Sequence, residues 1–231
     1  MQAGAVLAGV LSAAHVEAAV IYTARSSMLQ TSHGVCDAQG CGQRIDNSSS
    51  STDFAPYDVS IDSGFASGIA TASQQSSMDA SGITVSMLST AEGQAIAAAA
   101  SRFSVDFVLD EAMLLHLVGY NYNYWDGGHT TVRLTGPDGF QLQSQYTYTN
   151  GTIDDYRIDT ADPPTGWPPT AYPTVLQPGA YTFFVDAVAE GPFRHFISGA
   201  TAQLSLAPVP IPAAWLLLAS GLMGVSFLRR R

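Results

Sequence analysis

Residues 103–109 read Phe-Ser-Val-Asp-Phe-Val-Leu and carry the clearest structural signal in this chain. Apolar side chains occupy every second position, a period that is typical of a β-strand with one buried face. Asp110-Glu111 follow as a turn, and a second apolar segment runs from Met113 to Gly119. The sequence therefore predicts two consecutive strands at this point.

The same alternation recurs on both sides of this segment, between turns rich in Gly, Pro and Asp. Further predicted strands cover residues 21–29, 58–62, 69–73, 82–87, 131–135, 140–143 and 200–206, and residues 175–187 are predicted to be a turn that runs into a strand. The turn at Gly136-Pro137-Asp138-Gly139 predicts a hairpin, because proline presets φ and glycine accepts a positive φ. Residues 90–100 have high intrinsic helix propensity, yet we favour a strand there. Eight to ten short strands without a convincing helix predict an all-β fold, namely an antiparallel, jelly-roll-like β-sandwich.

The region before this sandwich differs in composition. Residues 31–51 form a polar stretch with four consecutive serines, which we expect to be a mobile connection. It holds the only two cysteines, Cys36 and Cys41, and in an exported protein the first interpretation is a disulfide that closes a small loop. A zinc site would need two further ligands, and only His33 lies close by. We therefore expect an N-terminal strand and Ser-rich, Cys-containing loop over residues 19–62, and the sandwich over 63–207.

The charge distribution excludes one class of partner. The chain has no lysine and nine arginines, three of them at the C-terminus, so six arginines face eighteen acidic residues between Ala19 and Pro208. Binding to a phosphate backbone depends on Lys and Arg replacing counterions. We therefore expect no nucleic-acid partner.

The N-terminus has the character of an export signal. A run of small and apolar residues spans Ala3 to Ala14, and Val16-Glu17-Ala18 offers small residues at the positions that a signal peptidase inspects. Residues 1–18 are therefore predicted to be a signal peptide. Its first residues, Met1-Gln2, lack the usual positive charge, and the alternative is an N-terminal core helix.

The C-terminal residues 208–231 have three parts. A proline-containing motif comprises Val209, Pro210, Ile211, Pro212 and Ala213; an uncharged apolar run continues to Leu228, and the chain ends in Arg229, Arg230 and Arg231. As a helix the apolar run is about 24 Å long, slightly shorter than the hydrocarbon core of a bilayer, which is about 30 Å thick. Terminal arginines stay on the cytoplasmic side. The sequence predicts a single transmembrane helix, and the alternative is a buried C-terminal helix. A transmembrane helix here would be either a plain single-span anchor or part of a sorting signal.

These three parts, in this order, resemble the PEP-CTERM sorting signal in its Val-Pro-Leu-Pro-Ala variant, with Ile211 in place of Leu and without the acidic residue of the commoner form. The resemblance covers about a tenth of the chain. It implies that an exosortase processes the tail, in a Gram-negative bacterium that makes an exopolysaccharide. The chain would then be an inner-membrane-anchored precursor that is later released to the cell surface or extracellular matrix, with a link to exopolysaccharide or biofilm. It would be the substrate of the enzyme and have no catalytic activity of its own.

No catalytic motif is present in the sequence. It lacks the Gly-x-Ser-x-Gly elbow, the His-Glu-x-x-His helix and the phosphate-binding loop, and its histidines are scattered singly. The neighbouring carboxylates at 110–111 and 154–155 would point to opposite faces of a strand. We therefore predict no catalytic residues, no metal site and no cofactor, and a secreted hydrolase is the least supported function.

One segment predicts ligand binding. Between Gly119 and Gly128 the tyrosines Tyr120, Tyr122 and Tyr124 alternate with asparagines, and Trp125 follows at the expected turn. On a strand the tyrosines would share one face, and aromatic faces suit sugar rings. The alternative function is therefore a carbohydrate-binding module, although tyrosines are also common on strands for cross-strand packing.

Overall fold

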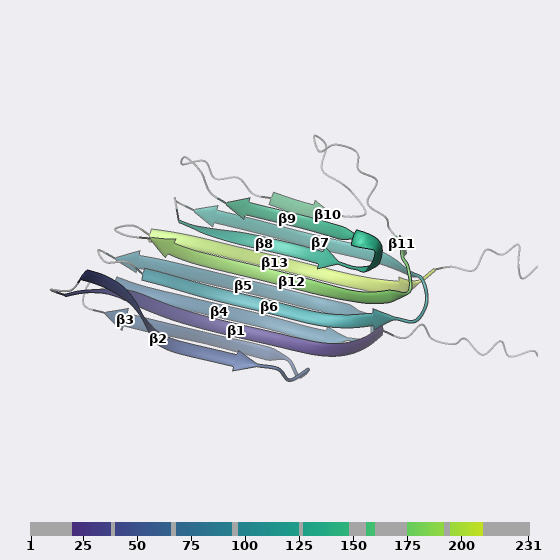
Figure 1. Cartoon of the computed structure of the whole chain (residues 1–231), viewed down its shortest axis with the longest axis horizontal. Coiled ribbons are helices and arrows are strands. Elements are labelled where there is room, and N and C mark those ends of the chain that lie inside the picture. The colour runs from purple at the N-terminus through teal and green to yellow at the C-terminus, as the bar shows by residue number, and fades with distance from the viewer. Residues whose placement is uncertain are drawn as a thin grey trace, which may run out of the picture.

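The computed structural model describes residues 20–37, 40–65, 68–93, 97–124, 127–147, 156–159, 175–191 and 195–209. Within these ranges the chain forms two sheets in which all neighbouring strands pair antiparallel. The prediction of an all-β antiparallel sandwich is confirmed. Two stacked layers, with strands running along the long axis of the molecule, are visible in Figure 1.

The first sheet, called sheet A here, has six strands. Its order is β2 (Gly40–Ser51), β1 (Val20–Asp37), β6 (Ala97–Leu109), β12 (Gly179–Gly191), β8 (Gly128–Thr135) and β9 (Gln141–Thr147). The short 3₁₀ turn η1 (Pro137–Gly139) joins β8 to β9, which confirms the predicted hairpin. Asp138 takes a positive φ of 55° in this turn.

The second sheet, called sheet B here, has seven strands. Its order is β10 (Tyr156–Asp159), β7 (Met113–Tyr124), β13 (His195–Pro208), β5 (Gly82–Gly93), β4 (Gly68–Asp79) and β3 (Tyr57–Phe65), and β11 (Val175–Leu176) also pairs with β7. The chain crosses between the sheets repeatedly, from β5 to β6, from β6 to β7, from β7 to β8 and from β12 to β13.

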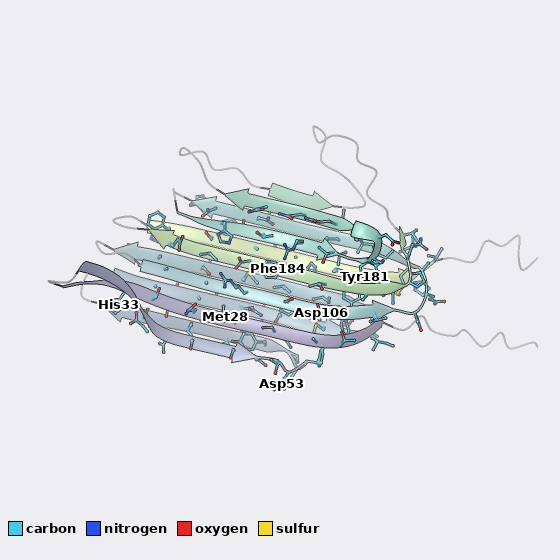
Figure 2. The ribbon with its side chains drawn as sticks, viewed as in Figure 1. Met28, His33, Asp53, Asp106, Tyr181 and Phe184 are labelled. Atoms are coloured by element: carbon cyan, nitrogen blue, oxygen red, sulfur yellow. The ribbon has the colours of Figure 1, made fainter. Side chains whose placement is uncertain are left out.

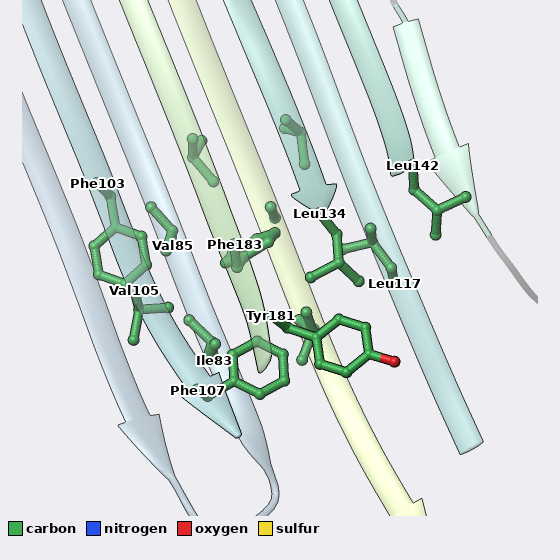
Figure 3. Packing of buried hydrophobic residues seen from close by; sticks show 14 of the residues in the cluster. Ile83, Val85, Phe103, Val105, Phe107, Leu117, Leu134, Leu142, Tyr181 and Phe183 are labelled. Atoms are coloured by element: carbon green, nitrogen blue, oxygen red, sulfur yellow. The ribbon is translucent and has the colours of Figure 1, made fainter. Parts of the chain in front are cut away.

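Period-two patterns explain which faces meet. Along β5 and β6 buried and accessible side chains alternate almost without exception. Phe103, Phe107 and Phe183 are fully buried and form the apolar centre with Leu117, Leu134 and other residues of both sheets (Figure 3). Burying such large side chains stabilises each by about 1.5–3 kcal/mol, so this cluster accounts for most of the hydrophobic stabilisation.

The chain enters and leaves the sandwich at the same end. In sheet A, Val20 pairs with Leu109, and Leu109 pairs with Gly179 on its other side; in sheet B, Pro208 pairs with Met113. Only three residues separate Leu109 from Met113, so these positions lie together, at the right of Figure 1. We call this the terminal end, and the opposite end, which contains Ala97 and Tyr124, the far end.

The interior changes character along the strands. Towards the far end the buried side chains are mostly small: Ala70, Ala72, Ala91, Ala97, Ala99 and Ala189, with Leu29, Tyr57 and Phe196. Buried polar groups accompany them, including Ser101, Asn121, Asn123 and Thr130. This follows from the Ser-, Ala- and Gly-rich composition of residues 63–101, 23 of 39 positions, which supplies little apolar area. The far half of the sandwich therefore has the weaker core.

The N-terminal region differs from the prediction. The supposed mobile connection over residues 31–51 forms the end of β1 and all of β2, which pair as a hairpin. On its other edge, β1 pairs with β6 from Val20 to His33, and the boundary expected between residues 62 and 63 falls inside β3. The prediction was wrong because polar, Ser-rich strands lack an apolar period, and only their partners in the sheet reveal them.

Two other expectations have clear outcomes. Residues 90–93 and 97–100 belong to β5 and β6, so strand rather than helix is correct there. Strands are also longer than predicted, up to the 18 residues of β1. The expected signal peptide, and the expected transmembrane helix at 213–228, lie outside the described residues. Within the described ranges, no helix is long and apolar enough to cross a membrane.

Candidate functional site

The predicted tyrosine row exists on strand β7. Tyr120, Tyr122 and Tyr124 lie on the outer face of sheet B, with ring centroids 5.7 and 5.6 Å apart. Successive ring planes are inclined by 43° and 66°, so the rings pack against one another instead of forming one flat surface. Tyr120 is the most accessible, at 37% exposure. Trp125, the fourth predicted residue, lies outside the described residues.

Tyr122 also has a structural role. Its partner across the β7–β13 pair is Gly199, and a Cβ placed on that glycine would lie only 2.3 Å from the tyrosine ring. The ring therefore covers the glycine backbone, an aromatic–glycine pairing that protects a weak point in a sheet. Burial raises the pKa of the Tyr122 hydroxyl, with a smaller effect from Tyr124. This packing accounts for at least one of the three tyrosines without any ligand.

The asparagines between the tyrosines point into the sandwich and are fully buried. Asn121 donates hydrogen bonds to the carbonyl and the hydroxyl of Ser144, at 3.2 and 3.0 Å. Asn123 accepts a hydrogen bond of 2.7 Å from the Ser198 hydroxyl. Asn121 therefore links β7 of sheet B to β9 of sheet A, and Asn123 links β7 to β13 within sheet B. Both side chains hold the fold together and are not available to a ligand.

Three histidines that are isolated in the sequence pair with carboxylates in the structure. His33 contacts Asp46 across the β1–β2 hairpin, and His195 Nδ1 lies 2.9 Å from a carboxylate oxygen of Glu92. His129 Nε2 lies 3.0 Å from Asp186 Oδ2. All three pairs lie towards the far end, and each joins two strands. Each pair therefore links the side chains of two neighbouring strands.

Asp186 is the centre of a small charged cluster on the outer face of sheet A. Its side chain is only 7% exposed, because Arg102 and His129 cover it from the neighbouring strands. Arg102 Nε lies 3.3 Å from Asp186 Oδ1. The hydrogen bond with Asp186 raises the pKa of His129, and the negative charges of Asp186 and Glu190 act in the same direction, against burial and Arg102. Sequence analysis did not identify this cluster, since its members are up to 84 positions apart.

Two hollows open on this same face. One, of about 340 Å³, lies over Ala98 and Ala100 beside Arg102. The other, of about 440 Å³, lies over Ala180 beside Asp106. Both are open and are lined by a mixture of apolar and polar groups. Sequence analysis missed both, because each is formed by strands that are distant in the chain.

The remaining predicted residues are only partly described. Cys36 and Cys41 are directly opposite each other in the β1–β2 hairpin. Opposite residues of an antiparallel pair have Cα atoms about 4.5–5.5 Å apart, within the range that a disulfide spans. Val209 follows the last residue of β13 and is 38% exposed. The rest of the sorting motif, from Pro210 to Ala213 and at Arg229 to Arg231, lies outside the described residues.

The described part of the chain brings together no set of metal-binding side chains. Within it, no three His, Cys, Asp or Glu side chains come close enough together to hold a metal ion. Asp110 and Glu111 are both exposed in the turn between β6 and β7. Comparison with known proteins adds no assignment: no family model matches this chain, and no curated protein matches it.

Proposed function

We propose that this chain is an exported, non-enzymatic protein of the cell surface or extracellular matrix, sorted through its C-terminal residues 208–231. In this proposal an exosortase recognises Val209 to Ala213, a transmembrane helix over 213–228 holds the precursor in the inner membrane, and the terminal arginines retain it there. The mature sandwich, of jelly-roll-like type, then associates with exopolysaccharide in a biofilm.

The observation that supports this proposal is the position of the chain ends. Val20, the first described residue, and Pro208, the last residue of β13, lie at the terminal end of the sandwich. A leader before Val20 and a tail after Pro208 would thus emerge on one side. The far end would then point away from the membrane, and cleavage of the tail would leave both sheets intact.

Fractionation and intact mass of the protein in its natural host test the proposal. We expect a precursor in the inner membrane and a surface product that lacks the residues after the proline motif. Replacing Arg229, Arg230 and Arg231 by glutamine should weaken retention of the precursor. A full-length protein that stays in the membrane, with unchanged fractionation of the variant, would exclude sorting and leave a simple anchored domain.

A carbohydrate-binding module is the second candidate, with Tyr120, Tyr122, Tyr124 and Trp125 as its binding residues. The accessible tyrosine row on sheet B favours it, whereas the inclined rings are unfavourable for stacking on a flat polymer. A polysaccharide pull-down with the native chain and with Tyr120→Ala tests it. Equal recovery of both proteins would rule out the row as the binding surface.

A further inference from the structure

The hollow near the far end of sheet A results from a difference in side-chain size. On β6 the outward residues Ala98 and Ala100 are small, whereas Gln30 of β1 and Glu190 of β12 carry longer side chains. Register places Ala100 between Gln30 of β1 and Val188 of β12. Two positions closer to the far end, Ala98 lies between Ser32 and Glu190. Arg102, two positions from Ala100 in the other direction, borders the hollow on the side nearer the middle of the sheet.

The hollow near the terminal end has the same construction on the adjacent strand. Ala180 of β12 is its small residue, and Asp106, Thr135 and Thr182 form the polar side. Asp106 accepts a hydrogen bond of 2.7 Å from the Thr182 hydroxyl, which fixes one carboxylate oxygen. The carboxylate is half-buried and keeps accepting capacity for a further partner.

Both hollows lie on one face and follow the strands. Ala100 and Asp106 are six positions apart on β6, which corresponds to about 20 Å. Phe184 lies between them on β12, with the Arg133 guanidinium 5.1 Å from its ring centroid. Figure 2 shows Met28, Asp106 and Phe184 on the neighbouring strands of this face. A ligand that fills both hollows must therefore be an extended chain.

The lining chemistry restricts what that chain can be. Arg102 only donates hydrogen bonds, Glu190 and Asp106 only accept them, and Gln30 and Thr135 do both. Hydroxyl groups, which donate and accept, satisfy all of these partners. The alanine methyl groups at the base of each hollow offer apolar surface to the C–H faces of a sugar ring. We propose that the outer face of sheet A binds a neutral polysaccharide chain, with one sugar unit in each hollow.

Charge favours a neutral polymer over an anionic one. Arg102 and Arg133 on this face are balanced by Asp106, Asp186 and Glu190, and the whole chain has a formal charge of −10. A polyanion would approach an acidic protein against long-range repulsion. The ion pair between Arg102 and Asp186 also leaves little net positive charge for a carboxylate or sulfate group.

The test is affinity electrophoresis of the purified full-length chain in gels that contain hydroxyethylcellulose, dextran or alginate. We expect retardation by one of the two neutral polymers and none by alginate. Ala100→Leu and Ala180→Leu each fill one hollow from an outward-facing position, so both should preserve the fold and weaken binding roughly tenfold. Ser60→Leu is the matched control, since it places the same side chain on the outer face of sheet B.

The outcomes separate this inference from its competitors. Urea unfolding of each variant shows whether its fold is intact. Retardation that persists in both hollow-filling variants, retardation by alginate alone, or none by either neutral polymer would overturn the inference. Loss of binding in Tyr120→Ala, with the hollow-filling variants unaffected, would assign binding to sheet B. The inference does not rest on the sorting proposal, because binding is measured on the purified chain whatever its processing in the cell.

Discussion

Replacing the buried Arg25 should expose how the N-terminal hairpin is joined to the rest of the sandwich. Arg25 of β1 is only 4% exposed, and its guanidinium lies 5.6 Å from the centroid of the Phe103 ring. It donates hydrogen bonds to the Asp53 carbonyl at 2.7 Å, to the Ala55 carbonyl and to the Ser76 hydroxyl at 2.8 Å. One side chain thus ties β1 to the segment between β2 and β3, and to β4.

The expected loss follows from these contacts. The bond to Ser76 is buried, and a hydrogen bond to a charged donor contributes about 1.5–3 kcal/mol. The carbonyls of Asp53 and Ala55 belong to exposed residues and can bond to water, so their loss costs less. Burial lowers the pKa of Arg25, which shows that desolvation offsets part of the gain. For Arg25→Met, which keeps apolar contact with Phe103, we expect a loss of about 2–3 kcal/mol in the free energy of unfolding.

Urea denaturation measures this change, and the melting temperature should fall by roughly 5–10 °C for a chain of this size. Arg133→Met is the control, because that guanidinium also lies over an aromatic ring but at the surface. We expect the control to change the unfolding free energy by about 1 kcal/mol or less. A loss for Arg25→Met no larger than for the control would refute the view that Arg25 joins the N-terminal hairpin to sheet B.

Three further predictions concern single features. Gly199→Ala forces the Tyr122 ring off the sheet, so we expect a loss of about 1 kcal/mol in urea unfolding; an unchanged midpoint would contradict the role of the ring as a cover. The pKa of His129 is raised in the folded state, so its stabilisation is complete below the unfolded value of about 6.5 and is lost as pH rises through the folded pKa. In His129→Gln the decrease in unfolding free energy between about pH 6 and pH 8 should therefore be smaller than in the unchanged protein. A pH profile of the variant parallel to that of the unchanged protein would contradict this prediction. Cys36 and Cys41 should resist alkylation until the protein is reduced, as intact mass would show, and labelling of the unreduced, folded protein would exclude the disulfide.

How much of the fold the sequence predicts depends on local apolar content. The strand at residues 103–109 and the Pro-Asp-Gly hairpin are predicted correctly, because their signals come from neighbouring residues. The strand β2 is missed, since Gly40–Ser51 is stabilised by pairing with β1 and not by an apolar period of its own. The alternation of tyrosines and asparagines on β7 predicts the correct faces, while the inclination of the rings and the covering of Gly199 depend on β13.

The class of fold, the acidic character of the chain and the three-part tail that motivates the sorting proposal can all be read from the amino-acid sequence. These properties are local or additive, so composition, charge and period are sufficient to derive them. The tertiary structure places Val20 of β1 and Pro208 of β13 at the same end of the sandwich and brings His129 and Arg102 together at Asp186. It also makes the small residues on β6 and β12 the base of hollows. Each of these depends on which strands become neighbours and in what register, and a register shift of one residue would turn every side chain to the other face.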